Sequence, residues 1–279
     1  MIDTLILSGG GPSGIAYIGV LQALYDKEIL TPDLTGIKEI ITTSVGILMA
    51  YPLIIGLKNR IVYEISKKYD LSKFLSFDKI HINDILLDYG LFHTDGMRSI
   101  MKALTQAVFQ TETITLQELY EKIPIKLTVK VYNTTDSRVE YISHINHPDM
   151  SVITLAEMTT AIPFMFKPVS YQNKLYCDGG IRGSFPLEAC RSESYLGICL
   201  KGMMTEYVGE IDVVKMFPFL KYILSLVSNN TEHEDADRVI NLIVGAGLNF
   251  ELGPDEKEKA IENAYNETIR QLEENTNLR

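Results

Sequence analysis

The hydrophobic and polar positions near the N-terminus follow a pattern that occurs twice. In the first unit, the apolar run of residues 5–7 is followed directly by glycines. Beyond the glycines, apolar residues recur at helical spacing, and these are Ile15, Ile18, Val20, Leu21 and Leu24. A short apolar run, a cluster of small residues and a periodic apolar stretch predict a strand, a tight loop and a helix in that order.

The second unit has the same layout. Residues 37–41 mark a short apolar strand with two polar residues near its start. Residues 45–57 form an uncharged, mostly apolar stretch, which predicts a helix that begins at Ser44. Because a membrane span needs about 20 apolar residues, this stretch is expected to be a buried helix and not an anchor.

The remainder of the chain alternates between strand-like and helix-like segments. Strands are expected at residues 125–131, 138–142, 174–176 and 195–200. Helices are expected at residues 94–109, 115–123, 152–158, 216–226 and 255–272. Such alternation indicates an α/β fold with a largely parallel sheet that helices cover on both faces.

Three of these helices carry more specific signals. Thr94 and Asp95 are placed to begin the helix at 94–109, and Thr115 with Glu118 forms a capping box. Pro254 is placed to begin the last helix. One face of that helix is expected to carry Ile261, Tyr265, Ile269 and Leu272.

The composition favours one large domain over residues 1–279. Of the 279 residues 46% are hydrophobic, and no linker or repeat divides them. The formal net charge of −10 argues against nucleic acid as a partner. The cysteines, Cys177, Cys190 and Cys199, lack metal-ligand spacing and are expected to stay reduced. Met1 is followed at once by strand residues, so a cytoplasmic location without a signal peptide is expected.

Candidate chemistry coincides with the two predicted loops. Residues 9–14 read Gly-Gly-Gly-Pro-Ser-Gly, and a glycine loop at a helix N-terminus exposes N–H groups where negative charge is favoured. Ser44 lies on the sharp turn between a buried strand and a helix. This is the position of a nucleophile elbow, which exposes the hydroxyl and offers the N–H of Val45 to an oxyanion. Together the two loops indicate a serine hydrolase with a backbone oxyanion hole.

A third feature lies far downstream. Asp178 follows the short strand at 174–176 and precedes Gly179 and Gly180. An aspartate before two glycines is by itself only a turn signal. Its place in order after the glycine loop and the serine turn gives it more weight.

The three motifs together resemble the patatin-like phospholipase family, whose members carry G-G-G-x-[KR]-G, G-x-S-x-G and D-G-[GA]. The resemblance implies that Ser44 is the nucleophile and Asp178 the base of a Ser–Asp dyad. It places the oxyanion loop at Gly9, Gly10, Gly11 and Gly14. It also implies a three-layer α/β sandwich in a single domain, with the motifs within residues 5–185 and a closing strand and helix within 238–273.

Two positions depart from the family pattern. Thr42 stands where the nucleophile motif has its first glycine, and its branched Cβ is expected to crowd the crossing of strand and helix. Ser13 stands where the glycine loop has its basic residue, so a cation near the oxyanion is missing while the backbone donors remain. Since removing one oxyanion donor costs about 3 to 4 kcal/mol in comparable enzymes, the backbone donors are the larger contribution.

The expected reaction is acyl transfer to water from a phospholipid or lysophospholipid. Ser44 attacks the ester carbonyl, Asp178 accepts its proton, and the amides of Gly10, Gly11 and Val45 hold the oxyanion. Burial is expected to raise the pKa of Asp178 and make it a better base. No metal or other cofactor is expected, and contact with a membrane surface is expected to be transient.

Three alternatives stay open at this point. A Ser–His–Asp esterase would use His233, because the chain order Ser44, Asp178, His233 is typical of α/β-hydrolases. His233 itself lies in a polar cluster. A lipid-binding pseudoenzyme would explain Thr42 and Ser13. A dinucleotide-binding protein would use the glycine loop with Asp33, about 20 residues further on.

Two segments also have more than one interpretation. Basic and aromatic residues alternate between positions 57 and 74, which suits either a solvated helix face or a lip that faces anionic lipid. The helix at 94–109 carries an apolar stripe that suits either the core or an acyl groove. That stripe consists of Met97, Ile100, Met101, Leu104 and Val108.

Overall fold

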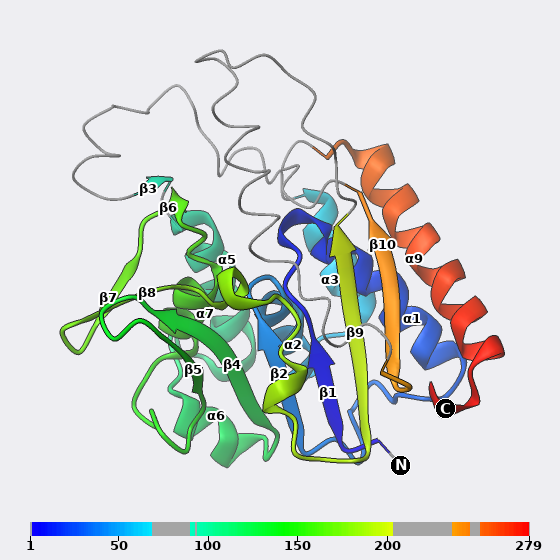
Figure 1. The fold of residues 1–279 in the computed structure, drawn as a ribbon, viewed down its shortest axis with the longest axis horizontal. Helices are drawn as coiled ribbons and strands as arrows, with labels where there is room; N and C mark the ends of the chain where they lie inside the picture. The colour runs from blue at the N-terminus through cyan, green and yellow to red at the C-terminus, as the bar shows by residue number, and fades with distance from the viewer. Residues whose placement is uncertain (1, 69–89, 93, 203–235, 246–251, 279) are drawn as a thin grey trace.

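The computed structural model describes residues 2–68, 90–92, 94–202, 236–245 and 252–278. Its centre is an 8-stranded sheet with the order β10-β9-β1-β2-β4-β8-β7, and β5 pairs with β4 beside this path (Figure 1). The strands of this sheet are β1 (Thr4–Leu7), β2 (Glu39–Thr43), β4 (Lys126–Asn133), β5 (Arg138–Ile142), β7 (Val169–Tyr171), β8 (Lys174–Asp178), β9 (Tyr195–Gly202) and β10 (Val239–Val244). A smaller sheet pairs β3 (Gly90–Phe92) with β6 (Phe164–Phe166).

The sheet is parallel from β10 to β4 and antiparallel beyond it. Strands β5 and β8 both run antiparallel to β4, and β7 runs antiparallel to β8. The central strands are buried on both faces, since Leu5, Ile6 and Leu7 are all inaccessible to solvent. Continuous apolar runs are typical of parallel strands that are covered on both sides.

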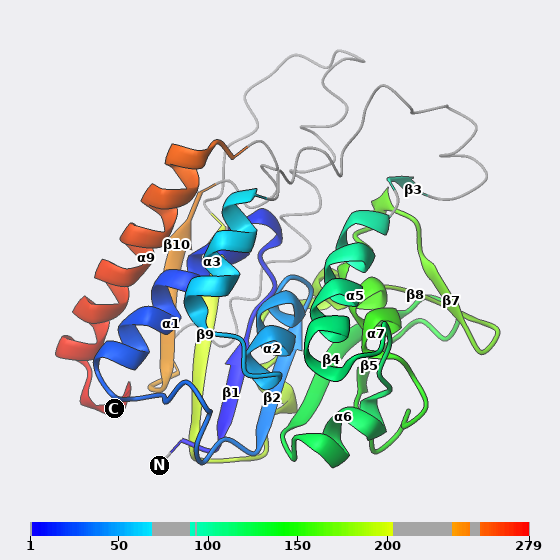
Figure 2. The same ribbon diagram turned by 180° about the vertical axis from the view of Figure 1, so that it is seen from behind.

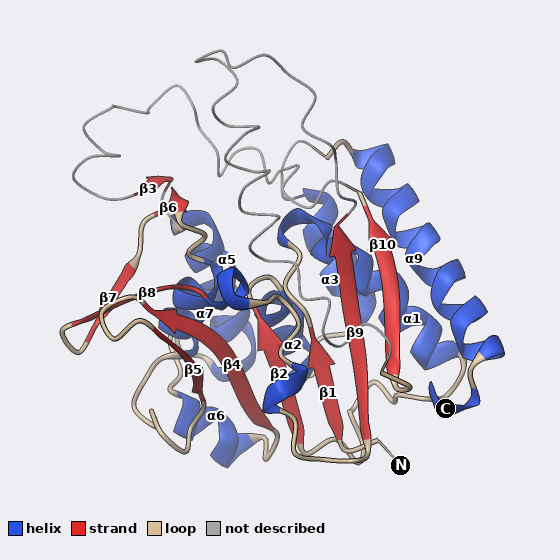
Figure 3. Cartoon of the chain, in the orientation of Figure 1, coloured by secondary structure: helices blue, strands red, loops and turns tan. Residues whose placement is uncertain are grey.

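Helices flank this sheet, as expected for the predicted α/β fold. Figures 2 and 3 show α1, α2, α3 and α5 over one face of the sheet, and α9 along α1 and the edge strand β10. The longer helices are α1 (Ala16–Asp26), α2 (Gly46–Ile54), α3 (Asn59–Lys68), α5 (Asp95–Phe109), α6 (Leu116–Lys122), α7 (Val152–Thr160) and α9 (Pro254–Glu274). On the opposite face, Phe185 packs with Ile6 and Ile41 beside the 3-10 helix η5 (Leu187–Ala189). The predicted fold class is thereby confirmed.

The register of three neighbouring strands determines which residues lie level with one another. Thr43, the last residue of β2, is level with Lys130 of β4. The next residue of β4, Val131, is level with Asp178 at the end of β8. The residue after Thr43 and the end of β8 therefore lie at the same height on either side of β4.

Most predicted elements are present, with changed ends. Strand β2 starts at Glu39, whose carboxylate accepts a hydrogen bond from Thr128 and lies 2.9 Å from Lys126. Of the two polar positions only Glu39 therefore belongs to the strand, while Ile37 and Lys38 precede it. Helix α2 ends at Ile54, short of residue 57. The capping box at the start of α6 is confirmed. The helix expected at residues 216–226 lies outside the described residues.

The face that the last helix buries overlaps the predicted one and is shifted from it, since Ile261 is partly buried against the core. Of its four predicted core residues only Leu272 is buried, whereas Ala264 and Thr268 are buried as well. The cause is the close contact with α1, because a Cβ at Gly19 would lie 2.1 Å from the carbonyl oxygen of Ile261. Small side chains fit where the two helix backbones come together, and the larger ones lie beside the contact.

Candidate active site

Ser44 occupies a sharp turn between β2 and α2. Its φ is 52°, in the left-handed region that a residue with a Cβ rarely adopts. Its N–H donates to the hydroxyl of Thr159 at 2.7 Å, and that hydroxyl donates in turn to the carbonyl of Lys130 at 2.8 Å. Such a strained conformation persists only where its surroundings hold it. Thr159 and Lys130 supply that support.

Thr42 is accommodated by the glycine that follows the serine turn. A Cβ at Gly46 would lie 2.0 Å from the Thr42 Oγ1, so only a glycine at position 46 leaves room for this side chain. The expected crowding between strand and helix is therefore present and is met by Gly46. Within the described residues, the buried hydroxyls of Thr42 and Thr43 have no hydrogen-bond partner.

The structure brings Ser44 and Asp178 together. The Ser44 hydroxyl donates to Asp178 Oδ2 at 2.6 Å, and the N–H of Gly180 donates to Asp178 Oδ1 at 2.7 Å. Both side chains are buried, with 6% of Ser44 and 4% of Asp178 exposed. Hydrogen bonds to a carboxylate are short and strong when solvent is excluded, so the two groups form a well-defined pair.

Burial dominates the ionisation of Asp178. Desolvation raises its pKa from 3.8 to about 6, although the hydrogen bonds from Ser44 and Gly180 and the charge of Lys130 act in the opposite direction. At neutral pH the carboxyl group is thus mostly ionised. It is also a stronger base than an ordinary aspartate by about 2 pKa units.

The glycine loop lies beside this pair, in the 3-10 helix η1 (Gly11–Ile15) and the residues before it. The N–H of Gly9 donates to the carbonyl of Ser184 at 2.8 Å, so it is already engaged. By contrast, the N–H groups of Gly10, Gly11 and Val45 donate to no acceptor within the described part of the chain. Those three amides are therefore available to a bound anion.

The other two glycines allow close packing around the serine. A Cβ at Gly9 would lie 3.2 Å from the Cβ of Ser44, and a Cβ at Gly14 would lie 2.5 Å from the Val45 side chain. Gly11 adopts a φ of 52°. The predicted loop thus divides into positions that present N–H groups and positions where a side chain would displace the elbow.

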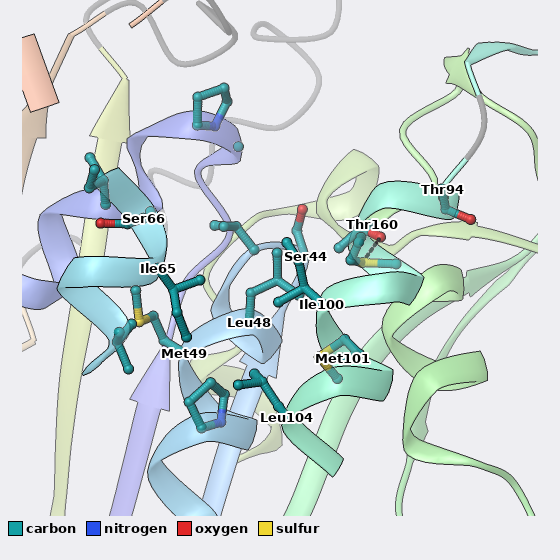
Figure 4. Close-up of a pocket in the computed structure, with 18 of the residues that line it drawn as sticks. Ser44, Leu48, Met49, Ile65, Ser66, Thr94, Ile100, Met101, Leu104 and Thr160 are labelled. Carbon is teal, nitrogen blue, oxygen red and sulfur yellow. Dashed lines mark hydrogen bonds between the residues drawn. The ribbon is translucent and has the colours of Figure 1, made fainter. Parts of the chain in front are cut away.

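An apolar cavity of about 220 Å³ opens beside Ser44, between α2, α3 and α5 (Figure 4). Its wall includes Leu48, Met49, Ile65, Ile100, Met101 and Leu104. The sequence left two interpretations for the apolar stripe of α5, either a part of the core or a wall of an acyl groove. Its residues line this cavity, except for Val108, which is 38% exposed. A chamber whose wall is mostly apolar and includes the Ser44 hydroxyl suits a hydrocarbon chain that ends in a carbonyl.

Several other candidate residues lie elsewhere or outside the described residues. His233 falls outside them, and so does the part of the basic segment beyond residue 68. Within α3, Lys67 lies 4.9 Å from the ring centre of Tyr63.

The remaining polar candidate, Asp33, does not border the cavity, since it accepts hydrogen bonds from Thr35 in an exposed turn. Among the described residues, no group of three or more His, Cys, Asp and Glu could hold a metal ion. None of the helices described is both long and apolar enough to cross a bilayer.

Two residues around the pair were not anticipated from the sequence. Thr159 supports the turn from 115 positions away, and no local pattern marks it. Lys130 carries a signal that could have been used, since it is a charged residue in the middle of an apolar strand.

Comparisons with known proteins agree with the motifs. Residues 5–191 match the sequence profile of the family described as patatin-like phospholipase. A protein of Invertebrate iridescent virus 6 named probable lipid hydrolase 463L is 28% identical over 185 residues, which make up 66% of this chain and 62% of that protein. An uncharacterized protein of Acanthamoeba polyphaga mimivirus, R571, is 25% identical over 186 residues, 67% of this chain and 60% of that protein. The matched region spans less than two thirds of either relative.

Solved structures with the same fold are more distant in sequence. VipD from Legionella pneumophila superposes with a TM-score of 0.70 at 17% identity, covering 98% of this chain and 67% of VipD. ExoU in its heterodimeric complex with SpcU from Pseudomonas aeruginosa superposes with a TM-score of 0.53 at 17% identity, covering 98% of this chain and 52% of the matched one. These similarities concern the fold. Since the family profile covers more than half of the sequence and includes all three motifs, this chain belongs to the patatin-like phospholipase family.

Proposed function

We propose that this protein hydrolyses carboxylic ester bonds of lipids through Ser44 and Asp178, with a phospholipid or lysophospholipid as substrate. The hydrogen bond of 2.6 Å from the Ser44 hydroxyl to Asp178 Oδ2 is the observation on which the proposal depends. It joins a nucleophile to its base before any substrate is present. Membership of a phospholipase family and the similarity to a protein named probable lipid hydrolase support the lipid substrate.

The first half of the reaction acylates the serine. The Ser44 oxygen attacks the ester carbonyl carbon while its proton passes to Asp178. The carbonyl electron pair becomes an oxyanion, which the N–H groups of Gly10, Gly11 and Val45 stabilise. The tetrahedral intermediate then expels the alcohol, which takes the proton from Asp178, and the acyl group stays on the serine.

The second half returns the enzyme to its starting state. A water molecule gives a proton to Asp178 and attacks the acyl-enzyme, and the fatty acid leaves as Ser44 recovers its proton. The raised pKa of Asp178, about 6 instead of 3.8, makes each proton transfer to it easier by about 3 kcal/mol than transfer to an ordinary aspartate. The same burial that costs stability thus makes the carboxylate an adequate base.

The cavity next to Ser44 supports the choice of a lipid. It is apolar over most of its wall, and its volume of about 220 Å³ suits part of one acyl chain. Burying apolar chain there contributes about 0.8 kcal/mol for each methylene group. The headgroup of the substrate is expected to stay outside, at a membrane or micelle surface.

The decisive experiment is hydrolysis of a lipid panel, read by mass spectrometry, with the wild type, Ser44→Ala and Asp178→Asn. We expect fatty acid release from the wild type and none above background from either variant, while a Ser99→Ala control on the exposed side of α5 keeps full activity. Retained turnover in purified Ser44→Ala or Asp178→Asn would contradict the dyad.

Two further measurements separate the alternatives. A fluorophosphonate probe labels an activated serine, so an unlabelled Ser44 in the wild type would point to a lipid-binding protein without catalysis. The His233→Ala variant is expected to keep near-normal activity, and a large loss of rate would favour the Ser–His–Asp esterase.

A further inference from the structure

Lys130 is a buried charge that the reaction described above does not use. It lies in the middle of β4, and only 1% of its surface is exposed. Removing an ammonium group from water costs several kcal/mol unless partners replace the water. A lysine at such a position therefore needs an explanation in terms of what it contacts.

All three hydrogens of the ammonium group have acceptors. The Lys130 Nζ donates to the carbonyls of Arg182 and Gly183, each at 2.9 Å, and to Glu188 Oε1 at 2.6 Å. Tyr141 donates its hydroxyl to the same Glu188 oxygen. Since an ammonium group has three donors, Lys130 is saturated, and its position in the fold is well defined.

The loop that Lys130 holds connects two parts of the site. The loop starts at Asp178, and the N–H of Gly183 donates back to the carbonyl of Gly180 at 3.1 Å. At its other end, the carbonyl of Ser184 accepts the hydrogen bond from Gly9 in the glycine loop. Fixing the carbonyls of Arg182 and Gly183 thus fixes a segment that begins at the base and ends against the oxyanion loop.

The backbone of the same residue supports the serine turn. The carbonyl of Lys130 accepts from Thr159, whose hydroxyl receives the N–H of Ser44. A Cβ at Gly179 would lie 2.6 Å from this same carbonyl oxygen, so the chain just after Asp178 runs directly against Lys130. One residue of β4 therefore contacts the supports of the nucleophile, the base and the oxyanion loop.

We propose that Lys130 is a positioning residue for the reaction, which holds the loop after Asp178 in place and balances the negative charge of the buried carboxylate. The inference rests on the proposed function of Ser44 and Asp178 and goes beyond it. Lys130 does not touch the reacting atoms, so it acts through Asp178.

The surroundings of Asp178 make this role measurable through pH. The titratable and charged groups that act on it are the Ser44 hydroxyl, the Lys130 ammonium group and the Cys177 thiol. Burial raises the pKa of Cys177 to about 12, so this thiol is uncharged when Asp178 titrates. Desolvation raises the pKa of Asp178, and the charge of Lys130 opposes this rise together with the hydrogen bonds from Ser44 and Gly180.

The test compares the full-length wild type with the double variant Lys130→Met, Glu188→Gln. Removing both charges avoids leaving the Glu188 carboxylate without the cation that it pairs with. The readout is the rate at which a fluorophosphonate labels Ser44 from pH 5 to pH 9, with p-nitrophenyl octanoate hydrolysis as a second measure. We expect the midpoint of the acidic limb to move to higher pH in the double variant, and the rate at pH 6 to fall by a larger factor than the rate at pH 9.

A uniform loss at every pH, or no loss, with an unchanged midpoint would overturn the proposal, because a purely structural role predicts no shift. If the double variant does not fold, Lys130→Gln decides, since Glu188 is 39% exposed and water can solvate its carboxylate when the ammonium group is removed. That variant removes the cation that acts on Asp178, so its midpoint is expected to move to higher pH. An unchanged or lower midpoint overturns the proposal.

The failure of this inference is distinguishable from failure of the proposed function. A wild type in which Ser44 is not labelled, or a Ser44→Ala variant that still hydrolyses ester, overturns the proposed function and this inference with it. A wild type with Ser44-dependent hydrolysis and an unchanged midpoint in the Lys130 variant overturns this inference alone.

Discussion

The cavity beside Ser44 predicts a limit on the length of acyl chain that improves catalysis. An apolar cavity of about 150 Å³ in another protein holds benzene, which has six carbons. By the same ratio, the cavity of about 220 Å³ holds roughly nine carbons. Each added methylene is worth about 0.8 kcal/mol, close to a fourfold gain in kcat/KM, as long as it is buried. From a four-carbon to an eight-carbon acyl group, kcat/KM should therefore rise by about two orders of magnitude.

The assay is hydrolysis of p-nitrophenyl esters from two to sixteen carbons below their critical micelle concentrations, with kcat/KM measured for each. We expect a steep rise to about nine carbons and a plateau beyond. Figure 4 shows Leu104 at the end of the cavity away from Ser44. Leu104→Phe should fill that end and move the break to shorter chains by roughly two to three carbons.

The control is Val108→Phe, one turn further along α5 on an exposed position that does not line the cavity. It should leave the chain-length profile unchanged. A wild-type profile that rises evenly to sixteen carbons, or that does not depend on length, would refute the assignment of the cavity to the acyl chain. An equal shift of the break in both variants would refute it as well.

Three more predictions follow from the buried pair and its supports. Because Asp178 must be ionised to act as a base, the rate of Ser44 labelling by a fluorophosphonate should fall as the pH drops through about 6, and a midpoint near 4 would contradict the raised pKa. The folded pKa of Asp178 lies above its unfolded value, so its ionisation destabilises the fold by up to about 3 kcal/mol as the pH rises from about 4 to about 6. In urea titrations, Asp178→Asn should therefore gain stability relative to the wild type over that range, and a difference that does not change with pH would argue against the assignment. Thr159→Val should cost about 1 to 3 kcal/mol and slow labelling, since its hydroxyl makes two buried hydrogen bonds, whereas Thr43→Val, which removes an unpaired buried hydroxyl, should be near neutral; similar losses in both would contradict this account.

The core of the fold was predictable from local patterns, and the edge of the sheet was not. Residues 5–7 and 196–200 are buried, and their continuous apolar composition is typical of parallel strands that are covered on both faces. The antiparallel direction of β7 and β8 depends on how the chain returns to β4, which no short pattern records. The shift in the buried face of α9 was missed for a related reason, since that face is chosen by the contact with Gly19 on another helix.

The site shows the same division. Ser44 and the glycine loop lie at strand–helix junctions, which the neighbouring residues predict. Asp178 was predicted as the base from its motif. Thr159 and Lys130 act across 115 and 29 positions of sequence. A hydrogen bond over such separations leaves no local trace, except that a lysine within an apolar strand marks a position where burial needs a reason.

The register of β2, β4 and β8 bears on how this protein tolerates changes in length. Ser44 and Asp178 are separated by 134 positions, yet they are brought level by ladder pairs on either side of β4. Insertions into the connections outside these strands would leave the distance between the two groups untouched. Deleting one residue inside β8 would turn the carboxylate to the opposite side of the sheet. Natural or engineered variation in loop size is therefore compatible with an intact pair, whereas insertion or deletion of a single residue within those strands is not.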